Sequence, residues 1–135
     1  MHGTVTKMAA CAVSVLVLSA SGRQEQRVRP ELTVIYVGAE DCPPCRLWRR
    51  DYFPQFERSS DFPRLSYREI LSPRLFDLLD DKYWPDELRS YRDRLDQRSA
   101  VPLWFVVANG SIVMKAQGLR EWTDTALPEI RSLSH

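Results

Sequence analysis

The amino-acid sequence predicts an α/β fold in which helices flank a central mixed sheet of four strands. A continuous apolar run at residues 32–37 indicates a buried strand, and an amphipathic segment follows it after a short loop. A second strongly apolar run at residues 101–108 leads into Asn109-Gly110, which is the strongest short hairpin signal. With the segments between these runs, the predicted order is β-α-β-α(α)-β-β-α. This order joins a parallel half to a hairpin half.

The first half of the predicted domain contains two strands and one helix. Residues 31–37 form the first strand, which is central because its apolar character is unbroken. A helix over 43–59 carries an apolar stripe, and Pro54 should bend or interrupt it. Alternation over 65–70 predicts the second strand. The stripe of the helix consists of Leu47, Trp48, Tyr52 and Phe56.

An enlarged helical segment is predicted before the third strand. Ser72 and Pro73 suit the N-cap and first position of a helix, and a second helical piece spans 86–98 after a break at 80–85. The third strand at 101–108 and the return strand at 111–117 follow. A closing helix over 122–133, capped by Thr123 or Asp124, completes the domain.

The N-terminal residues have the three-part layout of a secretory signal. Lys7 precedes an apolar run at residues 8–18, which is followed by small residues up to Gly22. The run is short for a transmembrane helix, although an uncleaved membrane anchor is the alternative. We therefore expect a signal peptide at 1–21, a spacer at 22–30 and one domain at 31–135, with a periplasmic location.

Charge and cysteine count exclude several functions for the part after the signal. Of 19 Lys and Arg residues only Lys7 precedes residue 22, so 18 basic residues face 18 acidic ones, and nothing favours nucleic acid as a partner. Cys11 lies within the signal, which leaves Cys42 and Cys45. Zinc prefers about four ligands, so no metal or cofactor is expected.

The sequence Cys42-Pro-Pro-Cys45 follows the first strand and opens a helix, which is an arrangement suited to thiol redox chemistry. A thiol at a helix N-terminus meets free N–H groups and the positive end of the helix dipole, and both favour the reactive thiolate. We assign Cys42 as the attacking nucleophile because of its position at the cap. Cys45, one turn further, is the resolving thiol. The alternative is a static, stabilising disulfide.

The chain from residue 31 to 133 resembles the thioredoxin-like superfamily. The resemblance is carried by the strand–loop–CxxC–helix of residues 32–48, by Val101-Pro102 at the head of an apolar strand, and by the spacing of Pro102, Gly110 and Gly118. It implies a cis-proline at Pro102, facing the cysteines, and a substrate groove at Val101 and Pro102. It also implies protein substrates that exchange disulfides with the chain.

The sequence departs from the family around the cysteines. Asp41 replaces the tryptophan that precedes the first cysteine in thioredoxin, and Tyr36 replaces a buried aspartate thought to help proton transfer. The chain either does without that acid or uses Glu40 or Tyr36. Glu40 and Asp41 oppose thiolate formation, whereas Arg46 could stabilise it.

The direction of electron flow is predicted from the two prolines. Pro43 and Pro44 have no N–H to donate to a Cys42 thiolate, which indicates a reducing couple that a membrane electron donor would re-reduce. We expect the protein to be a monomer. A disulfide-forming oxidase or isomerase, and a non-redox binding module with a thioredoxin fold, are the alternative functions.

Overall fold

The computed structural model describes residues 1, 3, 29–96 and 98–135. The predicted signal segment and spacer therefore lie almost wholly outside the described residues. Within the described part, no helix combines the length and apolar character needed to cross a bilayer.

A mixed sheet of four strands in the order β2-β1-β3-β4 forms the centre of the domain. Strand β1 (Leu32–Ala39) runs parallel to β2 (Ser66–Ser72) and antiparallel to β3 (Leu103–Ala108), which pairs antiparallel with β4 (Ser111–Gln117). The predicted fold class is confirmed, including the central place of β1 and the division into a parallel and a hairpin half.

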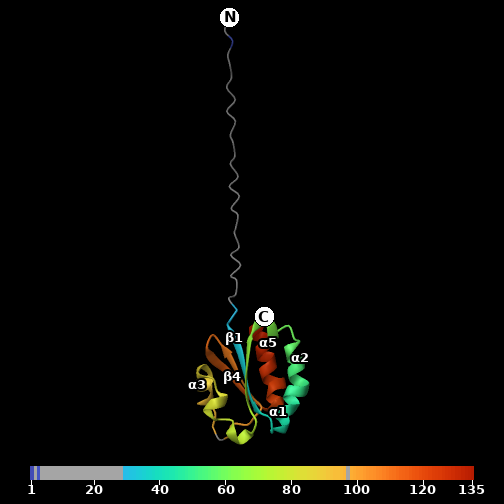
Figure 1. Cartoon of the computed structure of the whole chain (residues 1–135). Coiled ribbons are helices and arrows are strands. Elements are labelled where there is room, and N and C mark those ends of the chain that lie inside the picture. Colours follow the sequence, from blue (N-terminus) through green and yellow to red (C-terminus); the bar gives the residue numbers. More distant parts are fainter. Residues whose placement is uncertain (2, 4–28, 97) are drawn as a thin grey trace.

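Two apolar cores cover the two faces of this sheet. The side chains of Val34 and Tyr36 face one core, whereas Ile35 and Val37 face the other, so β1 is buried on both sides. Helices α1, α2 and α5 lie on one side of the sheet, and α3 lies on the other (Figure 1). This double burial is why β1 has a continuous apolar sequence instead of an alternating one.

The hairpin between β3 and β4 turns at the predicted residues. Asn109 and Gly110 both have positive φ, 50° and 77°, as a type I′ turn requires. The Asn109 side chain also accepts a hydrogen bond from the Glu31 N–H (2.9 Å), which ties the turn to the start of β1.

The chain is helical from residue 43, which follows Cys42, to residue 57, and Pro54 does not interrupt it. Helix α1 (Pro43–Leu47) passes into a π-helical turn (Trp48–Tyr52) and then into α2 (Phe53–Glu57). The Phe53 N–H donates to the Trp48 carbonyl, five residues back. Pro54 then falls in the first turn of α2, where a missing N–H costs little.

Of the two helices predicted between residues 72 and 98, the first does not form, and the second begins at Asp86 as predicted but ends at Arg92. Strand β2 continues through Ser72, and the chain then forms a series of short 3₁₀ turns (Leu75–Asp77, Asp81–Tyr83, Asp86–Leu88) with one helical turn, α3 (Arg89–Arg92). Ser72 does not cap a helix, because its hydroxyl donates to the Arg74 carbonyl (2.7 Å). Trp84 is buried instead, and its indole N–H donates to the Leu78 carbonyl (2.7 Å), which fixes a turn rather than a helix.

The closing helix starts earlier than predicted. Its helical turns are α4 (Gly118–Glu121), a π-helical turn (Trp122–Ala126) and α5 (Leu127–Ser134). The Glu121 carboxylate accepts from the Gln117 N–H (2.7 Å) at the true start. Thr123 is inside the helix, where its hydroxyl donates to the Leu119 carbonyl (3.1 Å), so neither Thr123 nor Asp124 is the cap.

Candidate redox site

Cys42 and Cys45 form a disulfide at the carboxyl end of β1, where the chain enters α1. Their Cα atoms are 5.2 Å apart. Cys42 has 6% of its surface exposed, whereas Cys45 is fully buried. Cys42, the residue assigned as nucleophile from the sequence, is therefore the more exposed of the two cysteines.

The first helical turn presents one N–H group to the Cys42 sulfur. The Cys45 N–H lies 3.3 Å from the Cys42 Sγ, and the Arg46 N–H donates to the Cys42 carbonyl oxygen (3.0 Å). Pro43 and Pro44, both exposed, have no N–H to contribute. With a single N–H of this turn near its sulfur, a Cys42 thiolate would be only weakly stabilised, as the two prolines predict.

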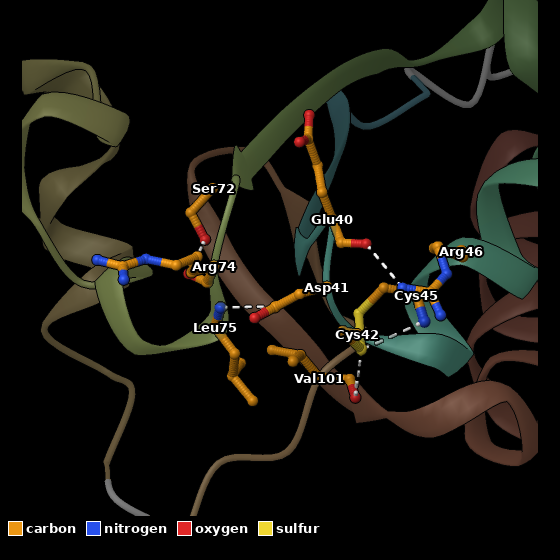
Figure 2. The surroundings of a disulfide bond; sticks show 9 residues. All are labelled: Glu40, Asp41, Cys42, Cys45, Arg46, Ser72, Arg74, Leu75 and Val101. Atoms are coloured by element: carbon orange, nitrogen blue, oxygen red, sulfur yellow. Dashed lines mark hydrogen bonds between the residues drawn. A yellow bond between two sulfur atoms is a disulfide. The ribbon is translucent and has the colours of Figure 1, made fainter.

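Val101 faces the disulfide from the loop before β3. Its carbonyl oxygen lies 3.8 Å from the Cys42 Sγ (Figure 2), and Val101 packs against the cluster formed by Ala39, Cys42 and Cys45. The peptide bond between Val101 and Pro102 is cis. Within residues 29–96 and 98–135, no backbone–backbone hydrogen bond involves Val101, whereas the Pro102 carbonyl accepts from the Gly118 N–H (2.8 Å). The predicted groove residues and the cysteines are thus adjacent.

Two charged residues near the cysteines, Arg46 and Asp41, form hydrogen bonds to the backbone of residue 40 and residue 75, not to the sulfurs. The Arg46 guanidinium donates to the Glu40 carbonyl oxygen (3.1 Å), and the Glu40 carboxylate points away from the sulfurs (Figure 2). The Asp41 carboxylate accepts from the Leu75 N–H (2.8 Å). Asp41 thereby ties the cysteine loop to the chain that follows β2, a role that sequence analysis did not predict.

Tyr36 lies in the core rather than at the sulfurs. It is fully buried, its ring stacks on Trp48 with centroids 5.8 Å apart, and its hydroxyl has no hydrogen-bond partner among the described residues. Burial, and secondarily the negative charge of Glu69, raises the pKa of Tyr36 above its ordinary value. The hydroxyl therefore keeps its proton at neutral pH, and Tyr36 cannot replace the buried carboxylate as a base.

We expect Gly38→Ala to destabilise the domain through Tyr36. A Cβ at residue 38 would overlap the Tyr36 hydroxyl and lie 2.6 Å from the ring carbon that carries it. Overpacking of this kind costs about 1–3 kcal/mol in the free energy of unfolding. Urea denaturation of the variant measures this loss.

Tyr36→Phe provides the control for this effect. Alone it removes a buried hydroxyl without a partner among the described residues, so it should be neutral or stabilising. Combined with Gly38→Ala it should recover part of the lost stability, because the nearest overlapping atom is gone. Strictly additive losses in the double variant would show that the two residues do not interact.

Three residues that line a cavity at the disulfide were missed by sequence analysis. The cavity, of about 390 Å³, is bounded by Leu75, Ser99 and Ala100, together with Asp41, Cys42, Pro43, Pro44 and Val101. Leu75 lies in the segment after Ser72 and Pro73 where a helix was predicted, and that helix does not form. No local pattern marks its approach to Cys42, since the two residues meet only through the Asp41 hydrogen bond and the fold.

Comparisons with known proteins found similar structures but no similar sequences among protein families or curated proteins. No protein-family model matches the chain, and a search of curated proteins found no match. Among solved structures, the thioredoxin Mala s 13 of Malassezia sympodialis is similar over 78% of this chain and 80% of its own, at 15% identity and a TM-score of 0.54. Thioredoxin f from spinach chloroplast matches 78% of this chain and 79% of its own, at 18% identity and a TM-score of 0.52. The periplasmic thioredoxin SoxS from Paracoccus pantotrophus is similar over 78% of this chain and all of its own, at 12% identity and a TM-score of 0.51.

These likenesses define the architecture of the domain. At identities of 12–18% they show the fold alone, and the chain has the thioredoxin-like fold. Within that fold, the Cys42–Cys45 disulfide lies at the start of the helix that follows the central strand β1.

Proposed function

We propose that this chain is a thiol–disulfide oxidoreductase that reduces disulfides of extracytoplasmic proteins. The observation that supports the proposal is the position of the cysteine pair: Cys42, which is 6% exposed, lines a cavity, Cys45 is fully buried, and Val101 packs against the cluster that contains both. A structural disulfide does not need a cavity beside it, whereas Cys42 lines one here.

The reaction is a two-step thiol–disulfide exchange. The Cys42 thiolate attacks one sulfur of the substrate disulfide, which forms a mixed disulfide and releases the other substrate sulfur as a thiolate. The Cys45 thiolate then attacks the Cys42 Sγ, which closes the Cys42–Cys45 disulfide and releases the second substrate thiol. Two electrons pass to the substrate, and a dithiol donor must reduce the pair again.

The extracytoplasmic compartment is proposed from the sequence of residues 1–21, which has the layout of a secretory signal. The thioredoxin-like fold is compatible with that compartment, since one of the similar structures is a periplasmic thioredoxin. A reductase in an oxidising compartment needs a dedicated electron supply, so we propose a membrane dithiol donor as partner.

The reduction potential of the Cys42–Cys45 couple tests the direction of the reaction. We expect a value close to that of thioredoxin, about −270 mV, because Pro43 and Pro44 leave the Cys42 thiolate with few donors. The measurement equilibrates the full chain against defined thiol buffers and follows the free thiols by alkylation.

Two other results would each replace the proposal. A potential near −120 mV would make the protein an oxidant that forms disulfides. A disulfide that cannot be reduced without unfolding the domain would leave a binding module with a static Cys42–Cys45 bond.

A further inference from the structure

An apolar surface flanks the disulfide on the side of residues 75–79. Of the five exposed large hydrophobic residues in the described chain, three lie here: Leu75 (50% exposed), Phe76 (93%) and Leu79 (51%). Single exposed apolar residues are common on protein surfaces, whereas several apolar side chains grouped beside a cavity indicate a contact surface.

The surface continues into a groove that leads from the reactive sulfur. The cavity beside Cys42 shares Leu75, Ser99 and Val101 with a second cavity of about 120 Å³. The second cavity is completed mainly by leucines: Leu78, Leu79 and Leu95. A chain bound at Cys42 could therefore place a neighbouring side chain among these leucines.

The walls of the groove are fixed in place by hydrogen bonds. Asp41 accepts from the Leu75 N–H (2.8 Å), and the buried Trp84 donates to the Leu78 carbonyl (2.7 Å) (Figure 2 shows the Asp41 bond). The apolar side chains thus have a defined position relative to Cys42. Their exposure is built into the fold and is not the result of a frayed helix.

The charge of the groove disfavours acidic ligands. Among the described residues that line the two cavities, the charged ones are Asp41 and Asp96, and both are acidic. Arg74, which adjoins Leu75, is paired with Asp77 (2.8 Å). An anionic disulfide such as oxidised glutathione would meet like charge here, whereas a neutral apolar segment would not.

We infer that the groove binds an extended segment of the substrate polypeptide, with an apolar side chain near its reactive cysteine and no acidic residue beside it. The inference rests on the proposed function, because Cys42 must bond to the substrate sulfur and the residues flanking that sulfur then lie over Leu75 and Val101. In an extended chain, residues two apart share a face and are about 7 Å from each other. An apolar residue two positions from the cysteine is therefore the one expected in the leucine-lined cavity.

The test compares exchange rates of the full chain with three oxidised probes. The first is a peptide disulfide with leucine two residues from its cysteine, the second has serine there, and the third is oxidised glutathione. We expect the leucine peptide to react at least about tenfold faster, in kcat/KM, than the serine peptide. Glutathione disulfide should be the slowest probe.

Variants of the apolar surface at residues 75–79 identify the part responsible: Phe76 is exposed on this surface beside the groove, and Leu79 lines the second cavity. Phe76→Ser combined with Leu79→Ser should lower kcat/KM for the leucine peptide about tenfold, while the serine peptide changes less than about twofold. Val113→Ser is the matched control, since Val113 is similarly exposed (47%) but lies in β4 outside both cavities. It should leave all three rates unchanged.

Two results would overturn the inference and leave the proposed function standing. One is an equal loss of kcat/KM for all three probes in the double variant, and the other is an unchanged kcat/KM for the leucine peptide. Absence of exchange between Cys42 and every probe would overturn both the inference and the proposed function. A binding measurement tests the groove without any disulfide exchange. A leucine peptide with serine in place of its cysteine should shift the NMR methyl resonances of Leu79 and Leu95. Unshifted methyls would overturn the inference even if small disulfides are reduced.

Discussion

Replacing Cys42 by serine should abolish the reduction of substrate disulfides, with a loss of at least about a thousandfold in rate. Cys42 is the more exposed cysteine of the pair, and a hydroxyl is a far weaker nucleophile than a thiolate. Reduction of a peptide disulfide by the dithiol form of the protein, followed by thiol release, measures the effect.

The Cys45→Ser variant tests the assigned role of the second cysteine. It retains the Cys42 nucleophile but cannot resolve the first product, so a mixed disulfide with the substrate should accumulate. Mass spectrometry of the quenched reaction would detect a species equal to protein plus substrate thiol. If Cys42→Ser retained the trapping ability and Cys45→Ser lost it, the assigned roles of the two cysteines would be reversed.

Replacing Trp48 by alanine should cost about 3–5 kcal/mol in the free energy of unfolding. Trp48 is fully buried on the helix that follows the cysteines, and its ring meets Trp122 and Trp104 edge-on with centroids 4.4 and 4.8 Å apart. Truncation would remove this contact area and leave a cavity between the sheet and the helices. Urea denaturation followed by circular dichroism measures the loss.

Phe76→Ala is the control for the loss of an aromatic ring as such. Phe76 is 93% exposed, so its truncation should change the free energy of unfolding by no more than about 0.5 kcal/mol. Similar losses in the two variants would mean that Trp48 does not anchor the core in the way the structure indicates.

The sheet and the cysteine pair could be predicted because their signals are local. A buried strand such as β1 needs apolar residues on both faces, and Asn109-Gly110 has the positive φ values that a tight hairpin requires. Cys42 and Cys45 are three residues apart, so their pairing needs only the first turn of a helix. The alternation in residues 65–70 likewise placed Tyr67 in one core and Ile70 in the other.

The structure of residues 73–85, before the helical turns that begin at Asp86, could not be predicted by the same means. The spacing of Leu75, Phe76, Leu78 and Leu79 fits a helix, but in the fold Leu78 is buried while Leu75, Phe76 and Leu79 are exposed. The indole of Trp84 decides the local structure by bonding to the Leu78 carbonyl, and Arg92 forms an ion pair with Asp81. These contacts link residues 6 and 11 positions apart, which is not the spacing of three or four residues on one helix face, so helical periodicity does not report them.

The order of the strands along the chain, the hairpin and the redox pair are specified by the sequence alone, because each depends on burial or backbone preference within a few residues. The tertiary structure was needed to show that Asp41 bonds to Leu75, that the hydroxyl of the core residue Tyr36 keeps its proton, and that an apolar groove opens beside Cys42. Each of these depends on residues that are distant in the chain and adjacent in space. Their energies come from packing and desolvation, which exist only once the sheet and its two cores have formed.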